Sequence, residues 1–446
     1  MKSLANHAVG SLHSIAMYIR TAANVAAMVF IFVWSATAQV PEAPAGHIVI
    51  FQPGTPPAAR ASSVQRVGAL VRFNYTVVDA VAVSLLDANA VAALQQDRSV
   101  AAIIPDRVMH AIQQPIVGDS PVSILASPQT IPAGVRRVGI PTSISNGNGI
   151  GVAIVDTGVD FTHPDLAPAA QSFTAVGTSC QDDNGHGTHV SGIVAALNNT
   201  IDVVGVAPNA KLYCVKVLDR LGTGSDSAVM AGLDWVFNNH SSVVPPIRVV
   251  NMSLGRPGSL EDNPPLRAFI QRLYNDGVVV VVAAGNDSNS QVNQEVPATY
   301  PEVLAVGSTT ALDGSNSCFL VQGRISADTA SYFTTDGKFD PNTRIGVTIS
   351  VPGEDRENTS VFCAVTSVGI LSTRLGGGTT RLSGTSMASP HVAGIVARFM
   401  QSGVAGPENI RGLLRAGADR KGLAPLDSPA AGYTFDGERE GVGKAP

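Results

Sequence analysis

The sequence predicts an α/β protein: a mainly parallel sheet flanked by helices, preceded by a small ferredoxin-like α+β domain. The 446-residue chain is 45% hydrophobic and 14% charged, which is enough apolar material for a large core. Between residues 129 and 446, nearly continuous runs of Val, Ile, Leu and Ala alternate with helix-like stretches. Strands that are buried on both faces have this pattern. Residues 46–110 instead follow the order β-α-β-β-α-β.

In the larger domain, five apolar runs are expected to form neighbouring strands. They are GIGVAIV (149–155), KLYCVKVL (211–218), IRVVNMSL (247–254), GVVVVVAA (277–284) and EVLAVGS (302–308). Helices between them imply right-handed crossovers and a parallel sheet. Because active sites of such sheets gather at the carboxyl ends of the strands, chemistry is expected just after each run. Residues 309–371 are predicted to be an insertion of surface loops.

In the smaller domain, the predicted elements are short. Strands are expected at 47–51, 71–78, 80–86 and 100–110, and helices at 61–70 and 87–97, the second capped by Asp87. A linker at 111–128 follows, with several prolines and no strong pattern.

The first 38 residues are typical of an export signal. Arg20 precedes the apolar run VAAMVFIFVW (25–34), and Ala36-Thr37-Ala38 gives a cleavage pattern. The run is too short to span a bilayer, although an N-terminal membrane anchor is the alternative. The sequence leaves open whether translation starts at Met1 or Met17.

The net charge and the cysteines further restrict the classes of partner and of site that the sequence allows. A net charge of −5 gives no reason to expect nucleic acid or an anionic membrane as partner. The cysteines are Cys180, Cys214, Cys318 and Cys363, with no C-x-x-C pair. In an exported protein they can form disulfides, and pairing of sequence neighbours, Cys180 with Cys214 and Cys318 with Cys363, is favoured over free buried thiols.

Three polar clusters lie where a strand ends or a helix begins. Asp156 follows one strand, His186 begins a helix-like stretch, and Ser386 precedes another. A serine hydroxyl needs a base to become a nucleophile, and a carboxylate fixes the tautomer of the imidazole that serves as that base. His189 and His391 are interpreted as packed side chains rather than further bases.

The segments around these residues resemble signature motifs of the subtilisin-like serine peptidase family. They are DTGVD (156–160), HGTHVSG (186–192) and GTSMASPHVAG (384–394). The resemblance implies a subtilisin-like fold with Asp156 as orienting acid, His186 as general base and Ser386 as nucleophile. It gives Ser383 and Ser389 supporting roles. Asn286, in AAGND, matches the family's oxyanion-hole asparagine; taken alone it would be a turn residue.

The resemblance also implies binding sites for substrate and for structural calcium. The expected substrate-binding residues are Ser253, Leu254, Gly255, Gly222, Gly224, Ala284 and Gly285, which would take an extended peptide as an added strand. The expected calcium ligands are side chains of Gln129, Asp165 and Asn199 and carbonyls of Leu197, Ile201 and Val203. A polar loop ending a helix is the alternative to the calcium site. Glu295 could lie near the floor of the first specificity pocket and favour a basic side chain, although broad specificity with apolar preference is expected.

The predicted function is a secreted serine endopeptidase made as an autoprocessed zymogen. Residues 1–38 would be the signal peptide, 46–110 an inhibitory propeptide, 111–128 a linker with the processing site, and 129–446 the catalytic domain. Proteins or peptides would be its substrates, and we expect a monomer without stable membrane association. A catalytically inactive peptide-binding relative is one alternative. An acyl hydrolase is another, but the G-x-S-x-G elbow of that group is missing around Ser386.

Overall fold

The computed structural model describes residues 46–112, 127–140, 145–320, 322–420, 425, 428 and 439–446. The predicted signal segment and most of the predicted linker lie outside the described residues. None of the described helices combines the length and the hydropathy that a membrane-spanning helix needs.

A seven-stranded sheet forms the centre of the larger domain, and every pair of neighbouring strands in it is parallel. Its spatial order is β17-β14-β12-β10-β6-β8-β7. The strands are β6 (Gly151–Asp156), β7 (Phe173–Thr174), β8 (Lys211–Lys216), β10 (Ile247–Met252), β12 (Val279–Ala283), β14 (Val303–Thr310) and β17 (Ile349–Glu354). The parallel α/β prediction is therefore confirmed.

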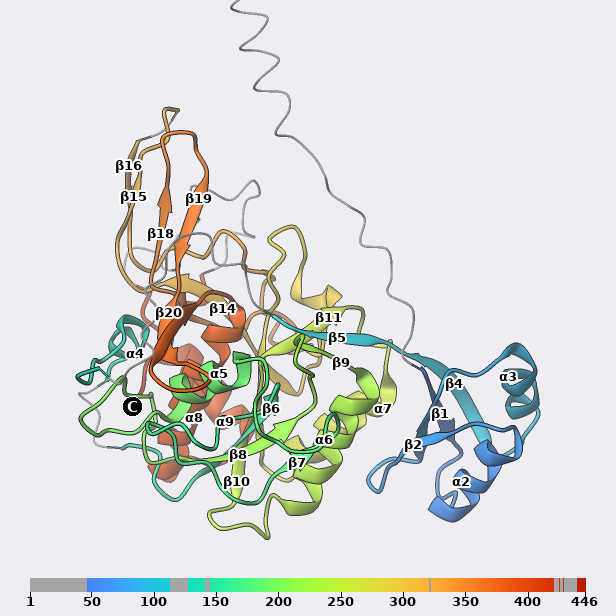
Figure 1. Ribbon diagram of the computed structural model, residues 1–446. Coiled ribbons are helices and arrows are strands. Elements are labelled where there is room, and N and C mark those ends of the chain that lie inside the picture. The colour runs from blue at the N-terminus through green and yellow to red at the C-terminus, as the bar shows by residue number, and fades with distance from the viewer. Residues whose placement is uncertain are drawn as a thin grey trace, which may run out of the picture. The chain divides into compact units, whose positions relative to one another are not determined.

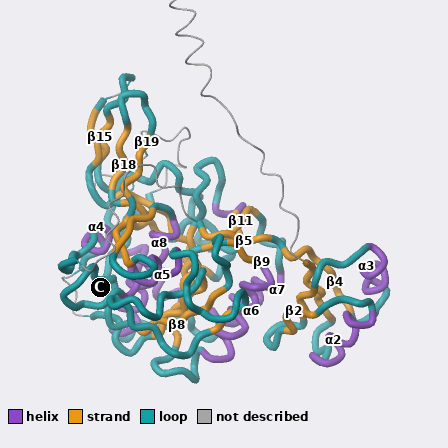
Figure 2. The backbone as a smooth tube through the Cα atoms, viewed as in Figure 1, coloured by secondary structure: helices purple, strands orange, loops and turns teal. Residues whose placement is uncertain are grey.

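Helices cover both faces of this sheet (Figures 1 and 2). They are α4 (Ala133–Arg137), α5 (His186–Ala195), α6 (Asp226–Asn239), α7 (Pro264–Asn275), α8 (Thr385–Gln401) and α9 (Pro407–Ala416). Side chains of β12 alternate between two separate cores: Val280 and Val282 pack with α6 and α7, whereas Val279 and Val281 pack with α5 and α8. Burial on both faces explains why the strand is an unbroken apolar run.

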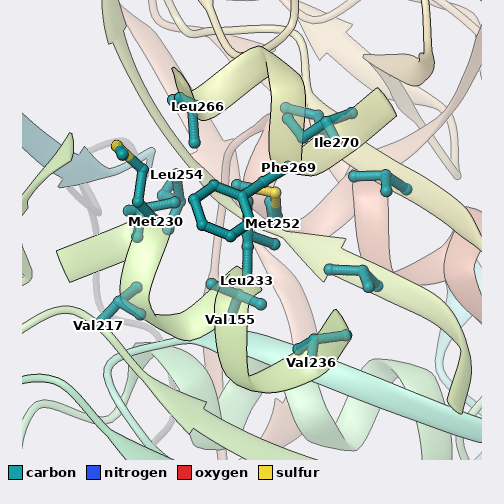
Figure 3. Packing of buried hydrophobic residues seen from close by; sticks show 14 of the residues in the cluster. Val155, Val217, Met230, Leu233, Val236, Met252, Leu254, Leu266, Phe269 and Ile270 are labelled. Atoms are coloured by element: carbon teal, nitrogen blue, oxygen red, sulfur yellow. The ribbon is translucent and has the colours of Figure 1, made fainter. Parts of the chain in front are cut away.

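Phe269 of α7 lies in the middle of the first core. Figure 3 shows its ring between side chains of α6 and the sheet, among them Leu233 and Met252. The helix begins at Pro264, whose fixed φ suits the first helical position, and Asn263 accepts a hydrogen bond from the backbone N–H of Leu266 (3.0 Å).

The predicted surface-loop insertion at 309–371 is partly wrong. Its residues 349–354 form β17, an edge strand of the central sheet that pairs with β14. The run ISVPGE is buried along its length, but its proline and glycine weaken the strand pattern in the sequence. The remainder forms a second sheet from β15 (Gly314–Asn316), β16 (Gly323–Ile325), β18 (Arg356–Thr359) and β19 (Val365–Val368). The hairpin β20 (Ile370–Thr373) and β21 (Thr379–Leu382) then leads to α8.

The smaller domain has the predicted β-α-β-β-α-β order. It consists of β1 (Gly46–Phe51), α2 (Pro57–Arg66), β2 (Val71–Asn74), β3 (Ala80–Val83), α3 (Ala88–Gln95) and β4 (Val100–Asp106), with sheet order β2-β3-β1-β4. The first helix begins earlier than expected because Pro57 suits its first turn. In β3, Val81 and Val83 face the small domain's own core, whereas Ala80 and Ala82 pack into the core of the larger domain.

The predicted last strand, 100–110, is in fact two strands that belong to different sheets. After β4 the chain passes Arg107 and forms β5 (Val108–Ala111). This strand lies between β9 (Thr223–Ser225) and β11 (Leu254–Pro257) of the larger domain, and β13 (Glu295–Val296) completes the sheet. Nothing local in the sequence of this segment reveals that its second half pairs with distant residues.

Both disulfides join the sequence neighbours that were favoured: Cys180 with Cys214, and Cys318 with Cys363. They close loops of similar length, with separations of 34 and 45 residues. Cys214 lies fully buried in the central sheet, whereas Cys318 and Cys363 lie beside the exposed side chains of Phe319 and Phe362.

We expect the two disulfides to contribute unequally to global stability. Chain entropy alone gives each about 4 kcal/mol. The hairpin ends that carry Cys318 and Cys363 can open locally, however, without unfolding the rest. Replacing Cys180 and Cys214 by alanine should lower the free energy of unfolding by about 2–5 kcal/mol. Replacing the other pair should cost clearly less. Urea unfolding of both variants, with Ser386 replaced by alanine, measures the difference; equal losses would contradict the expectation.

Candidate active site

Asp156 and His186 meet at the carboxyl edge of the central sheet. Asp156 is the last residue of β6, and His186 is the first of α5. Their side chains are buried, and His186 Nδ1 lies 2.8 Å from Asp156 Oδ1. That contact leaves the other ring nitrogen, Nε2, to act as an acceptor, and Nε2 has no hydrogen-bond partner among the described residues.

The backbone at Gly187 passes very close to the Asp156–His186 pair. A Cβ at Gly187 would lie 2.1 Å from the carbonyl oxygen of Gly158 and 3.1 Å from Asp156 Oδ1, so only glycine fits. Asp182 fixes the first turn of α5 by accepting hydrogen bonds from the backbone N–H groups of Gly185 (3.0 Å) and Thr188 (2.9 Å). Burial raises the pKa of Asp182, but these hydrogen bonds outweigh burial, and the pKa is lowered overall. The feature of the sequence that could have pointed to Asp182 is an acidic residue just before the predicted helix.

Ser386 is the second residue of α8 and is completely buried. Its hydroxyl donates to the carbonyl oxygen of Ser253 (2.9 Å), the residue that follows β10. The Ser253 hydroxyl in turn donates to the Ser386 carbonyl (2.9 Å) and contacts the Ser389 hydroxyl (2.9 Å). Ser383 bonds with Ser367 (2.7 Å). Ser383 and Ser389 thus lie in surrounding hydrogen-bond networks, as predicted.

Asn286 is held by Thr385, a contact that the sequence reading missed. Asn286 Oδ1 accepts hydrogen bonds from both the backbone N–H and the hydroxyl of Thr385, each at 2.9 Å. Because an amide is planar, this contact also fixes the direction of the donor end, Nδ2. Thr385 immediately precedes Ser386, so one residue couples the asparagine to the start of α8. The only feature of the sequence that points to Thr385 is its position within the segment GTSMASPHVAG.

The two other histidines near the site are packed, as predicted. His189 Nε2 lies 3.0 Å from the carbonyl oxygen of Ile370, and burial lowers its pKa to about 3. His391 Nδ1 lies 2.8 Å from the carbonyl oxygen of Met387, and burial lowers its pKa to about 4. Both are therefore neutral near pH 7.

Strand β5 occupies the edge where the sequence predicts substrate. It runs antiparallel to β11, with His110 opposite Gly255, and antiparallel to β9, with Met109 opposite Gly224. The N–H of Ala111 donates to the Gly222 carbonyl (2.9 Å), and the N–H of Ile112 donates to the Ser253 carbonyl (3.2 Å). That Ser253 carbonyl also accepts the Ser386 hydroxyl, so Ile112 lies directly beside Ser386. Ala284 and Gly285 follow β12 and are buried at the same end of the sheet.

The small domain is anchored on the helices behind this edge. Asp106 is buried and accepts hydrogen bonds from the backbone N–H (2.8 Å) and hydroxyl (2.6 Å) of Ser227, in the first turn of α6. A carboxylate at a helix N-terminus satisfies unpaired N–H groups and complements the helix dipole. The ring of Tyr75 contacts that of Phe269 edge-on, at 5.6 Å between centroids.

Three of the predicted calcium residues, Leu197, Asn199 and Val203, place an oxygen close to the side chain of Gln129. Its Nε2 lies 2.9 Å from the Leu197 carbonyl, 3.2 Å from Asn199 Oδ1 and 3.3 Å from the Val203 carbonyl. Asn199 Nδ2 donates to Asp165 Oδ1 (2.7 Å), and the N–H of Ile201 donates to Asn199 Oδ1 (2.8 Å). Burial raises the pKa of Asp165 to about 7. The described residues include no group of three or more His, Cys, Asp or Glu that could hold a metal, so any ligand set here would consist mainly of uncharged oxygens.

Most of the chain is similar to known proteins of a single family. Residues 147–433 match the subtilase family. Subtilisin E of Bacillus subtilis is 35% identical over 341 residues, covering 75% of this chain and 73% of its own. Subtilisin J of Geobacillus stearothermophilus is 34% identical over 340 residues, with the same coverage. A thermostable alkaline protease of Halalkalibacterium halodurans is 38% identical over 273 residues, covering 60% and 62%. Since the family match spans more than half of the chain, this protein belongs to the subtilase family and is a serine-type endopeptidase.

Proposed function

We propose that this chain is a secreted, self-inhibited precursor of an endopeptidase that cleaves peptide bonds with Asp156, His186 and Ser386. The observation that carries the proposal is the shared Ser253 carbonyl, which joins an extended segment of the chain to the nucleophile. A peptide bound as Ile112 is bound would present its carbonyl carbon to Ser386. No observation favours the inactive, peptide-binding alternative.

In the proposed reaction, Ser386 Oγ attacks that carbonyl carbon while His186 Nε2 takes the hydroxyl proton. Asp156 holds the imidazole through Nδ1 and stabilises the imidazolium that forms. The oxyanion accepts hydrogen bonds from the Asn286 amide and the Ser386 N–H, at the N-terminus of α8. His186 then returns the proton to the leaving amine, and water hydrolyses the acyl-enzyme by the same steps.

The small domain is proposed to be the inhibitory propeptide. Its sheet packs on α6 and α7 with the face opposite its own core, and its C-terminal strand β5 fills the substrate position. Within the predicted range 111–128, we infer that the processing site is the bond that follows Ile112, because the Ile112 N–H and the Ser386 hydroxyl share the Ser253 carbonyl. Secretion is proposed from the predicted signal segment and from the two disulfides, which are typical of oxidising compartments.

Calcium is proposed to bind the Gln129–Val203 oxygen cluster as a structural ion. The carbonyl oxygens of Leu197 and Val203 and the side-chain oxygen of Asn199 already surround Gln129 Nε2. The Asp165 carboxylate lies beside them, where it accepts a hydrogen bond from Asn199 Nδ2. Calcium accepts six to eight such oxygens, with carbonyls among them. When bound, it would supply a positive charge that holds this loop together, and the proposed reaction does not use it.

Ser386→Ala should abolish both proteolysis and maturation. Loss of this nucleophile costs about six orders of magnitude in turnover, a magnitude known from subtilisin. Casein hydrolysis should fall to background. The variant should stay at precursor mass, whereas the wild type should release a fragment that ends at Ile112. Ser402→Ala, at the far end of α8, is the control and should mature normally. Undiminished proteolysis or maturation by the Ser386→Ala protein would contradict the proposal.

Asn286→Ala should lower kcat by about 100- to 1,000-fold, again a magnitude known from subtilisin, because a donor to the oxyanion is lost. KM should change little, since the donor acts on charge that develops only in the transition state. Thr385→Val keeps the backbone contact to Asn286 and removes the hydroxyl contact, so we expect a loss of about tenfold. In the double variant, the Thr385 substitution should add little. Additive losses in steady-state kinetics on one peptide substrate would show that Thr385 does not act through Asn286.

Removal of calcium by a chelator should lower the melting temperature of the Ser386→Ala precursor. A ligand at 100 times its dissociation constant stabilises the folded state by about 2.7 kcal/mol. Asn199→Ala should remove most of this calcium dependence, because one converging oxygen is lost. Asn198→Ala, a change at the exposed neighbouring asparagine, is the matched control and should keep it. A chelator effect that is equal in all three proteins, measured by calorimetry, would place the ion elsewhere.

A further inference from the structure

Lys216 is a buried cation that the proposed reaction does not use. It is the last residue of β8, and only 1% of its surface is exposed. In the parallel register of the central sheet it lies opposite Asp156 of β6. A buried ammonium lowers the stability of a protein unless hydrogen bonds and a countercharge compensate for its lost hydration. The partners of Lys216 therefore indicate its role.

The Lys216 ammonium joins the turn after Asp156 to the segment before His186. Nζ donates hydrogen bonds to the carbonyl oxygen of Thr157 and to Asp183 Oδ1, the second at 2.6 Å. Thr157 directly follows the candidate acid in the chain, whereas Asp183 lies shortly before the candidate base. The Asp183 side chain is 53% exposed, so water solvates this carboxylate but not the ammonium.

Thr157 is bound on three other sides, and these contacts involve the acid and the start of α5. Its N–H donates to Asp156 Oδ1 (2.7 Å), its hydroxyl donates to Asp182 Oδ1 (2.9 Å), and the N–H of Gly187 donates to its hydroxyl oxygen (2.9 Å). Gly187 follows His186 in the first turn of α5. A shift of the Thr157 carbonyl would therefore displace both members of the Asp156–His186 pair, and a misplacement of about 1 Å can cost about 100-fold in rate.

The charge of Lys216 also acts on the Asp156–His186 pair. A positive charge stabilises the carboxylate and opposes protonation of the imidazole, whereas the negative charge of Asp183 has the opposite effect. The effect of Asp183 is the weaker of the two because this side chain is half-exposed and solvent screens it. The other titratable groups on the elements around the imidazole stay the same in the experiments below: Asp156, Asp160, Asp182, His189, His391, Arg220 and Arg374.

We propose that Lys216 is a positioning residue of the active site: by holding the Thr157 carbonyl, its ammonium keeps the acid–base pair in place. The inference rests on the proposed function, because it assigns Lys216 to the same triad. Neither of the hydrogen bonds described for Lys216 involves β5 or Ser386. Its removal should therefore affect the chemical step and leave substrate binding intact.

Replacement of Lys216 tests this role, with a matched control on the same strand. Lys216→Met removes the ammonium and should lower kcat on a peptide substrate by about 10- to 100-fold, with KM little changed. The unchanged KM shows that the variant is folded. Lys216→Arg keeps the charge and the donors and should restore most of kcat. Lys211→Met, at the other end of β8, also removes an ammonium that donates to a backbone carbonyl (3.1 Å, Ala167) and should behave as the wild type.

The acidic limb of the pH profile separates the effect of the charge from a general loss of structure. In Lys216→Met, the pH at which kcat/KM is half-maximal should rise by about one unit, because protonation of His186 is no longer opposed. In Asp183→Asn, which keeps an acceptor for the ammonium, this pH should fall by a smaller amount. The double variant should lie between the two single variants. A substitution that only loosens the structure gives no reason for shifts of opposite sign.

The outcomes distinguish this inference from the proposed function. If Ser386→Ala cleaves the peptide as well as the wild type does, the proposed function fails, and this inference fails with it. If Ser386→Ala is inactive and Lys216→Met retains the kcat of the wild type, only the role of Lys216 is overturned. The same holds if Lys216→Met and Lys211→Met lower kcat alike, or if Lys216→Met and Asp183→Asn shift the acidic limb in the same direction.

Discussion

Parallel pairing of β6, β10 and β12 is the constraint on which the rest of the structure depends. Val155 of β6 lies opposite Met252 of β10, which lies opposite Val282 of β12. The strands therefore end at one level, and the residues that follow them must meet there. In this way Asp156, Ser253 and Asn286, far apart in the sequence, share one edge of the sheet. The register is held in turn by side chains buried on both faces, where a shift would expose apolar surface.

The N-termini of helices α5 and α8 lie at the same edge of the sheet. α5 begins with His186 and α8 begins at Thr385, so each helix directs its first N–H groups toward the strand ends. Asp182 binds two such groups at α5, and the Thr385 N–H binds Asn286 at α8. Because these contacts are buried or partly buried, they hold the candidate site residues in one geometry. Such preorganisation is what electrostatic stabilisation of a transition state requires.

The small domain pairs with the same strands, β9 and β11, that are proposed to bind a substrate. β5 forms backbone hydrogen bonds with both β9 and β11, and Asp106 accepts a hydrogen bond from the Ser227 N–H in the first turn of α6. One face of its sheet contributes to the core of the larger domain. The proposed inhibition and the proposed substrate binding therefore involve the same strand edge.

The sequence by itself determined the parallel sheet, most of its strands and the family to which the chain belongs. Strands buried on both faces must be apolar throughout, and the motifs around Asp156, His186 and Ser386 are long enough to be specific. The break at Arg107, the place of β17 at the edge of the central sheet and the partners of β5 were decided only by tertiary structure, because pairing with distant residues leaves no local periodicity. The same holds for Thr385, whose type is ordinary in sequence and whose position matters because folding brings it beside Asn286.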